Sequence, residues 1–96
     1  MISLLPHETE LMGRWNFVAG DVLPDSTCVR IHDLIREGLV KIATDASGWN
    51  TLYRDPKDSR LWELTYPYSE MHGGGPPKLT CTSAQRARDV FGYSAA

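Results

Sequence analysis

The sequence predicts an α+β fold in which an antiparallel sheet, made of a three-strand meander plus flanking strands, packs against one main helix, with a short helix at the C-terminus. Two turn signals separate three strand-like runs between positions 39 and 66. Apolar residues recur at three- and four-residue spacing after Pro24, and a second helix signal follows position 83. A chain of 96 residues has room for one core, so we expect a single domain over residues 1–96.

A strand, a tight turn and the main helix are the first expected elements. Residues 11–18 alternate with the period of a half-buried strand, and the turn at 19–21 returns the chain as a short partner strand. The main helix starts at residues 24–26. Gly38 is its expected left-handed C-cap. The apolar face of the helix carries Cys28, Ile31, Leu34 and Ile35.

Two turns fix the register of the predicted meander. The turn at residues 45–48 ends in a left-handed Gly48 and joins strands 40–44 and 49–53. A second turn, at 55–59, leads into a strand over 61–66. With both turns closed in this way, the predicted cross-strand pairs are Val40 with Tyr53, Ile42 with Thr51, Tyr53 with Trp62 and Thr51 with Leu64.

The two faces of this meander differ in character. The expected core face, covered by the helix, carries Val40, Ile42, Trp49, Tyr53, Trp62, Leu64 and Tyr66. The opposite face is mixed, so it is either solvated or an interface, and it carries Lys41, Asp45, Asn50, Arg54, Glu63 and Thr65 with Leu39, Leu52 and Leu61. The three tryptophans could form a ligand-binding box, but their strand parity favours a packing role in the core.

A long loop precedes the last two elements. Residues 67–77 (PYSEMHGGGPP) show neither a helical nor a strand period. Loops of this length without secondary structure are disproportionately functional. Residues 78–82 predict one more strand. Ser83 then caps a short helix that runs through Phe91 and ends at Gly92.

Composition and charge argue against several classes of function. The net charge is −2 and no Lys/Arg cluster is present, which argues against a nucleic-acid partner. The N-terminal segment lacks the pattern of a secretory signal and no run is long enough to span a membrane, so we expect a cytoplasmic protein without a membrane partner. Cys28 and Cys81 lack metal-ligand spacing and are expected to be buried free thiols. The familiar nucleotide and zinc motifs are missing, so no cofactor is expected.

Glu70 and His72 are the one pair of residues to which chemistry can be assigned. They flank Met71 and can present a carboxylate and an imidazole on the same side of the loop, as a two-ligand metal site or an acid–base pair requires. A small metal-assisted hydrolase is therefore an alternative function. The favoured interpretation is that His72 hydrogen-bonds the backbone of its own loop. Together with Tyr68, these residues are also typical of protein interfaces.

Several long motifs resemble one known family. The strings KIATDASGWNTLYRDP and WELTYPYSEMHGGGPPKLTC, with ETELMGRWNF and the helix start DSTCVRI, resemble the Immunity protein 27 family of bacterial polymorphic toxin systems. The resemblance runs from Glu8 to Phe91. It implies a cytoplasmic antitoxin that binds a cognate toxin domain and blocks it stoichiometrically, without a cofactor or turnover. It assigns no residue to the contact with the toxin.

We expect the partner to bind an acidic and aromatic surface formed by the long loop and the exposed sheet face. The predicted partner-binding residues are Asp45, Glu63, Tyr68, Glu70 and His72. If the toxin is a nuclease, its active site is basic, and carboxylates facing it would speed encounter. The expected oligomeric state is a monomer or a weak dimer. A structural adaptor that self-associates through an open sheet edge is a further alternative.

Overall fold

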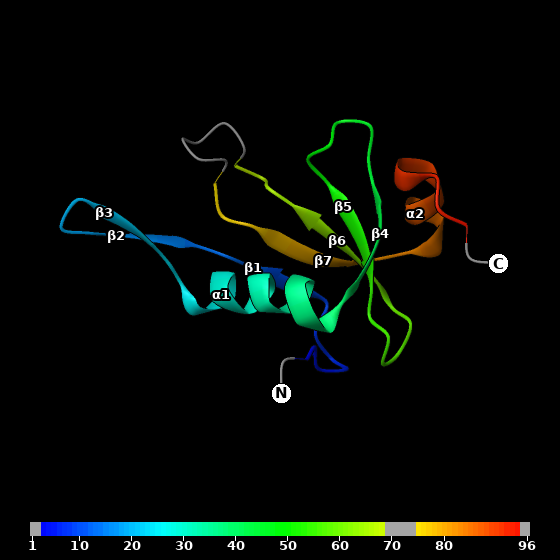
Figure 1. Ribbon diagram of the computed structural model, residues 1–96, viewed down its shortest axis with the longest axis horizontal. Helices are drawn as coiled ribbons and strands as arrows, with labels where there is room; N and C mark the ends of the chain where they lie inside the picture. Colours follow the sequence, from blue (N-terminus) through cyan, green and yellow to red (C-terminus); the bar gives the residue numbers. More distant parts are fainter. Residues whose placement is uncertain (1–2, 69–74, 95–96) are drawn as a thin grey trace.

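The computed structural model describes residues 3–68 and 75–94 and has the predicted α+β class. Its elements are β1 (Glu10–Met12), β2 (Trp15–Val18), β3 (Asp21–Pro24), α1 (Ser26–Asp33), the π-helical turn η1 (Leu34–Gly38), β4 (Val40–Thr44), β5 (Thr51–Arg54), β6 (Leu61–Thr65), β7 (Lys78–Thr82) and α2 (Ala84–Phe91). Figure 1 shows their arrangement.

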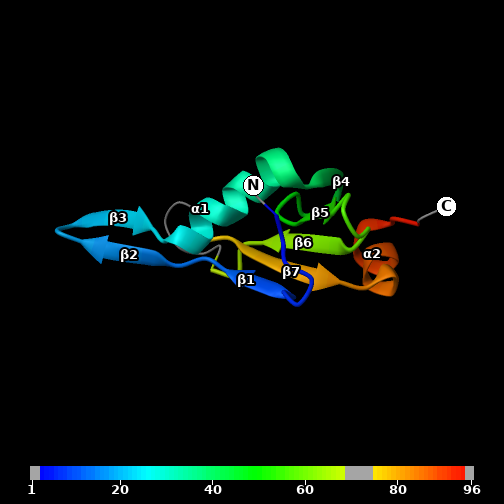
Figure 2. The ribbon, with the colours of Figure 1, turned by 90° about the horizontal axis from the view of Figure 1, so that it is seen from below.

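The strands form two separate antiparallel sheets. The main sheet has five strands in the order β1-β7-β6-β5-β4, so the predicted meander β4-β5-β6 forms one half and β7 and β1 extend it. Within the part of the chain that the structure describes, strands β2 and β3 pair only with each other. They form a two-stranded ribbon that projects away from the main sheet in both ribbon views (Figures 1 and 2). The turn at its tip is the predicted one, with Ala19 and Gly20 at φ of 51° and 86°.

The main helix begins as predicted but ends differently. The Asp25 side chain caps its N-terminus and accepts a hydrogen bond of 2.8 Å from the Cys28 backbone N–H. The prediction that Gly38 is a left-handed cap is wrong, because Gly38 lies inside the π-helical turn and Leu39 is the extended residue that follows. The Leu39 N–H donates to the Leu34 carbonyl at 2.8 Å. This wider turn satisfies the helix end while keeping both leucines buried.

The predicted register of the meander is correct for the hairpin β5–β6 and wrong for the hairpin β4–β5. Tyr53 pairs with Trp62 and Thr51 pairs with Leu64, as predicted. In the first hairpin Val40 pairs with Arg54 and Lys41 with Tyr53, so the predicted Val40–Tyr53 and Ile42–Thr51 pairs are wrong. One cause is a bulge between Lys41 and Ala43, which adds a residue to β4.

The other cause of the shift is a longer turn between β4 and β5. The Asp45 N–H donates to the Asn50 carbonyl at 3.0 Å, so the turn includes Trp49 and Asn50 as well as the predicted left-handed Gly48. Trp49 is therefore outside the strand and its side chain is 53% exposed, which overturns its placement in the core. Its ring makes an edge-to-face contact with the ring of Tyr66, and the two ring centroids are 6.1 Å apart. Val40 is also exposed rather than buried.

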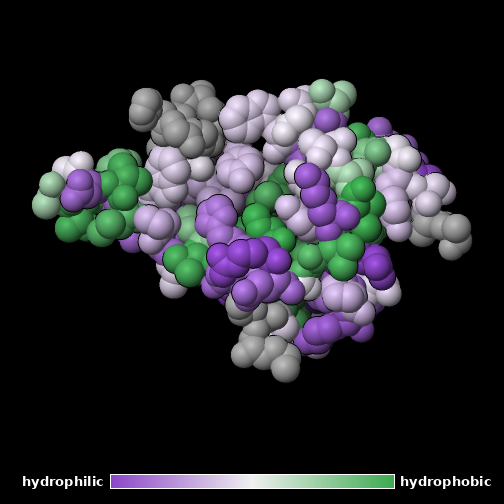
Figure 3. Space-filling model, in the orientation of Figure 1, coloured by the Kyte–Doolittle hydropathy of each residue, from purple (hydrophilic) through white to green (hydrophobic). Residues whose placement is uncertain are grey.

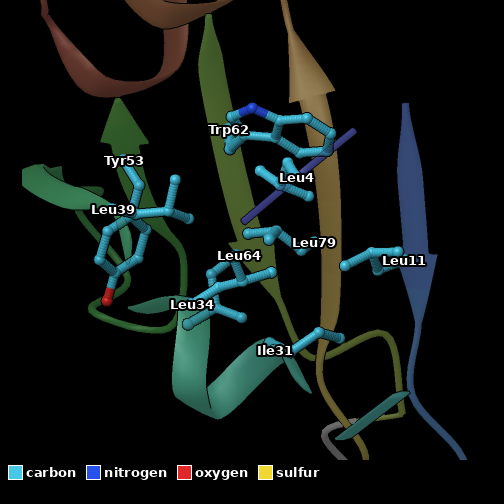
Figure 4. Close-up of a cluster of buried hydrophobic side chains, with 9 residues drawn as sticks. All are labelled: Leu4, Leu11, Ile31, Leu34, Leu39, Tyr53, Trp62, Leu64 and Leu79. Atoms are coloured by element: carbon cyan, nitrogen blue, oxygen red, sulfur yellow. The ribbon is translucent and has the colours of Figure 1, made fainter. Parts of the chain in front are cut away.

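The core lies between α1 and one face of the main sheet, as predicted. Tyr53, Trp62 and Leu64 are buried on this face, and α1 covers it in the side view (Figure 2). Trp62 has no exposed surface. The full cluster, drawn in Figure 4, comprises Leu4, Leu11, Ile31, Leu34, Leu39, Tyr53, Trp62, Leu64 and Leu79.

The opposite face of the main sheet is partly covered by α2. Figure 2 shows α2 beyond the end of β7, and Arg86 of α2 hydrogen-bonds Glu63. Glu63 alternates with Trp62 and Leu64 along β6 and so lies on the face opposite to the core. Leu52 of β5 and Ala87 of α2 are completely buried, and Glu63 of β6 is 4% exposed. The prediction that this face is a solvated or interface surface is therefore wrong at Leu52 and Glu63. Ser83 and Gly92 delimit α2 as predicted.

Candidate functional site

Glu63, one of the predicted partner-binding residues, lies beneath α2. Its carboxylate accepts two hydrogen bonds from Arg86, from Nε at 2.7 Å and from the terminal guanidinium nitrogen at 2.9 Å. The pair raises the pKa of Arg86 because the hydrogen bond to Glu63 stabilises the cation. With this geometry Glu63 ties α2 to the sheet and presents almost no surface to a partner.

Asp45 is engaged by its own turn. Its carboxylate accepts hydrogen bonds from the Ser47 hydroxyl at 2.6 Å, the Gly48 N–H at 3.1 Å and the Asn50 side-chain amide at 2.7 Å. The hydrogen bond from Ser47 is the largest cause of the lowered pKa of Asp45. These bonds explain the long turn, and they leave Asp45 with a structural role there.

Tyr68 is the predicted partner-binding residue with the most exposed side chain in the described part of the chain, at 47%. Glu70 and His72 lie outside the described residues. The chain re-enters the described region at Gly75, whose α-carbon faces the Tyr68 backbone. A Cβ at Gly75 would lie 2.5 Å from the Tyr68 carbonyl oxygen, and Gly75 has φ of 78°. Glycine is therefore required where the two arms of the long loop meet.

A cavity lies between Tyr68 and the base of the projecting ribbon. It has a volume of about 370 Å³. Six of its lining residues are consecutive and run from the end of β1 along β2. The lining consists of Met12, Gly13, Arg14, Trp15, Asn16 and Phe17, with Tyr68 and Pro76 on the other side. The cavity therefore lies where the chain leaves the main sheet, between β2 and the arms of the long loop.

The ribbon exposes apolar side chains on both of its faces. Phe17 and Val18 are 69% and 54% exposed, and Val22 and Leu23 are 46% and 49% exposed. Because paired residues share a face, the register places Trp15, Phe17, Val22 and Pro24 together on one side. Figure 3 shows hydrophobic colour gathered over this projecting end of the molecule. We call the ribbon and the cavity lining together the ribbon–cavity surface.

The base of the ribbon is fixed by close backbone packing. The Gly13 N–H donates to the Pro77 carbonyl at 2.9 Å, and a Cβ at Gly13 would lie only 2.6 Å from the Cys28 sulfur. The Cys28 thiol donates to the Arg14 carbonyl at 3.3 Å, and the Asp25 N–H donates to the same oxygen at 2.9 Å. Burial raises the pKa of the Cys28 thiol, which keeps it protonated as a donor.

Sequence reasoning did not identify the ribbon–cavity surface. A usable signal was present in the string FVAGDVL. Its two-residue turn is flanked by apolar residues that point to both faces of the hairpin, and an isolated hairpin cannot bury both faces. The cavity itself had no local signal, because its two sides are separated by about fifty residues of chain.

Two other kinds of feature, a metal site and a membrane-spanning helix, are not found among the described residues. Within residues 3–68 and 75–94 no three His, Cys, Asp or Glu side chains are grouped closely enough to hold a metal ion. No helix in the same ranges has the length and apolarity needed to cross a membrane.

A model of a known protein family matches most of this chain. The family model described as Immunity protein 27 matches residues 17–83, a span from β2 to the residue after β7. It includes the ribbon from Phe17, the main helix and the meander. No curated protein and no solved structure matches the chain.

Proposed function

The chain belongs to the Immunity protein 27 family, and from that membership we propose that it binds a cognate toxin domain of a polymorphic toxin system and neutralises it by direct contact. On this proposal the protein acts by stoichiometric binding and not by catalysis. It needs no cofactor. It protects the producing bacterium and its kin from within the cytoplasm, where the thiols of Cys28 and Cys81 stay reduced.

The observation that carries the proposed binding site is the ribbon–cavity surface. The small projecting ribbon exposes Phe17 and Val22 on one face and Val18 and Leu23 on the other. The face that carries Phe17 and Val22 continues through Trp15 into the cavity lining, and contiguous apolar patches mark interaction sites. The adjoining cavity is concave, so it can accept a side chain or a segment of the partner.

The residue types on this surface suit tight binding. Trp, Tyr and Arg dominate the energetics of protein interfaces, and the cavity lining contains one of each, in Trp15, Tyr68 and Arg14. Phe17 adds the most exposed aromatic side chain among the described residues. We propose that these side chains are the anchors and that the polar groups around them form the rim.

The long loop keeps a part in this proposal. Tyr68 lines the cavity, and Glu70 and His72 follow it closely in the sequence. We propose that Glu70 and His72 also contact the toxin, with Glu70 favouring encounter if the toxin's active site is basic. Glu63 and Asp45 are not included, because the bonds described above already occupy their carboxylates.

A titration against the toxin domain encoded by the neighbouring gene tests this function. The purified chain should bind that domain in a one-to-one ratio and restore growth to cells that express it. Two isosteric variants then test the site. Val22→Thr changes the ribbon, and Val29→Thr makes the same change at a comparably exposed position on α1.

The two variants have different expected outcomes. Val22→Thr should weaken toxin binding about tenfold, since a hydroxyl replaces a methyl group in an interface core. Val29→Thr should bind as the wild type does. Failure of the wild type to bind or to protect cells would contradict the proposed function. Equal affinities for the two variants would move the binding site away from the ribbon and leave the function intact.

A further inference from the structure

Among the described residues only β3 pairs with β2, and the other edge of β2, which we call its free edge, has no strand partner there. The Asp25 N–H donates to the Arg14 carbonyl, which makes these two residues a hydrogen-bonded pair across the ribbon. Hydrogen-bonded and non-bonded pairs alternate along an antiparallel ladder. In the observed register Trp15 pairs with Pro24 and Phe17 pairs with Val22, and these are the non-bonded pairs. The N–H and C=O groups of Trp15 and Phe17 therefore point away from β3.

This free edge faces the side of the strand on which β7 lies. Gly13 donates its N–H to the Pro77 carbonyl, so the backbone groups of Gly13 point toward β7. Backbone groups of alternate residues in a strand point to the same side, so those of Trp15 and Phe17 point in this direction too. Within residues 3–68 and 75–94, no strand pair continues the β1–β7 ladder past the Met12–Lys78 pair. The cavity occupies this side, with Tyr68 and Pro76 as its far wall.

The other edge of the ribbon is a poorer template. Along β3 the residues with outward backbone groups are Val22 and Pro24, and proline has no N–H to donate. Proline on an exposed strand is one of the devices that prevent pairing at an edge. The β2 edge has no such block over Trp15 and Phe17, and it borders the cavity.

We infer that an extended segment of the toxin binds as an added β-strand along the free edge of β2, antiparallel to it and in line with β7. This inference rests on the proposed function and specifies how the toxin is held. An extended backbone is the ligand that satisfies two alternating pairs of N–H and C=O groups, and strand addition is a recurrent mode of peptide recognition.

The charge and apolar character of the site define the chemistry of this segment. Arg14 lines the cavity, and no ion pair joins it to a carboxylate in residues 3–68 or 75–94. We therefore assign the segment a carboxylate that lies against Arg14. Its alternate residues are apolar, because they meet the face that carries Trp15 and Phe17.

A second copy of this chain fits the edge less well than a single extended segment. The β2 edge of each copy is flanked by its own Tyr68 and Pro76. In a symmetric pair of β2 edges these two arms would compete for the space into which the partner ribbon must enter. A single strand with no flanking arm avoids this conflict.

Residue-resolved amide hydrogen exchange, measured on the free chain and on its complex with the toxin domain from the neighbouring gene, tests the inference. The Trp15 and Phe17 amides should exchange fast in the free chain and at least about a hundredfold more slowly in the complex. The Val22 amide is the internal control. It should exchange fast in both states, because it faces the β3 edge.

Proline variants give a second readout with a matched control. Phe17→Pro removes the phenyl ring and the outward N–H, whereas Phe17→Ala removes only the phenyl ring. The proline variant should bind the toxin at least about tenfold more weakly than the alanine variant, because one backbone acceptor of the toxin segment loses its donor. Val22→Pro and Val22→Ala should bind with equal affinity. Melting curves confirm that each variant is folded.

Each contrary outcome has a distinct meaning. Fast exchange at Trp15 and Phe17 in a stable complex overturns strand addition and leaves the proposed function standing. Slow exchange that develops in the free chain as its concentration rises assigns the edge to a second copy and also overturns the inference. A wild-type chain that does not bind the toxin at all removes the proposed function and this inference together.

Discussion

Arg86 of α2 holds the carboxylate of Glu63 through two hydrogen bonds of 2.7 and 2.9 Å, in the middle of a sheet face where Glu63 is 4% exposed. The arginine side chain itself is 55% exposed. The bond therefore joins a buried acceptor to a donor that reaches it from the surface. It links the C-terminal helix to the central strand of the sheet.

Loss of this link should destabilise the fold. Arg86→Ala leaves the Glu63 carboxylate buried without a partner, and we expect a loss of about 1–3 kcal/mol in the free energy of unfolding. Arg88→Ala, on the same helix, removes an exposed bond to Gln85 and should change stability by less than about 0.5 kcal/mol. Urea denaturation measures both variants. A loss in Arg88→Ala as large as that in Arg86→Ala would contradict the assigned role of the pair.

Trp62→Ala should be the most damaging of these substitutions. Trp62 has no exposed surface and lies in the core between α1 and the sheet, so we expect a loss of about 3–5 kcal/mol. Trp49→Ala is the matched control, because Trp49 is 53% exposed on the β4–β5 turn. Thermal or urea melts of the two variants should differ widely. Similar melting behaviour would show that the core is misplaced.

Gly13→Ala should destabilise the base of the ribbon by about 1–3 kcal/mol. The added Cβ would lie 2.6 Å from the Cys28 sulfur and 2.8 Å from the Pro77 carbonyl oxygen, so the strand and the helix would have to separate. The measurement is the midpoint of chemical unfolding. An unchanged midpoint would mean that the packing at the base of the ribbon is loose, and the shape of the cavity would then not be fixed.

Stability should fall on acidification through loss of the Glu8–Arg30 pair. The side-chain hydrogen bond from Arg30 lowers the pKa of Glu8 from 4.5 to about 2. A lowered folded-state pKa gives stability that is present above the unfolded value and is lost as pH falls toward 2. The free energy of unfolding should be measured between about pH 5 and about pH 2. It should fall less over this range in Glu8→Gln than in the wild type. Equal acid dependence in the two proteins would contradict this assignment.

Local signals in the sequence predicted much of the fold. Asp25 and Ser83 begin helices, Gly48 and Gly92 adopt left-handed conformations, and each of these features depends on a few neighbouring residues. The Tyr53–Trp62 register also followed from a single turn. Such features need no knowledge of distant parts of the chain.

Features that depend on distant or competing contacts were not predicted correctly. Asp45 draws Asn50 into a longer turn, which moved Trp49 out of the strand and shifted the first hairpin. The burial of Glu63 depends on where α2 packs, a tertiary contact that no local pattern encodes. The cavity likewise forms where β2 meets the arms of the loop that contains Tyr68.

The affinity of Phe17→Ala for the toxin domain, compared with that of Trp49→Ala, tests the central claim most directly. Both substitutions remove a highly exposed aromatic side chain, but Phe17 lies on the ribbon–cavity surface and Trp49 lies on the β4–β5 turn. If the chain neutralises its toxin through this surface, Phe17→Ala should bind about 30-fold more weakly, the loss expected for an interface anchor. Trp49→Ala should bind as tightly as the wild type. Full affinity in a folded Phe17→Ala variant would contradict the claim.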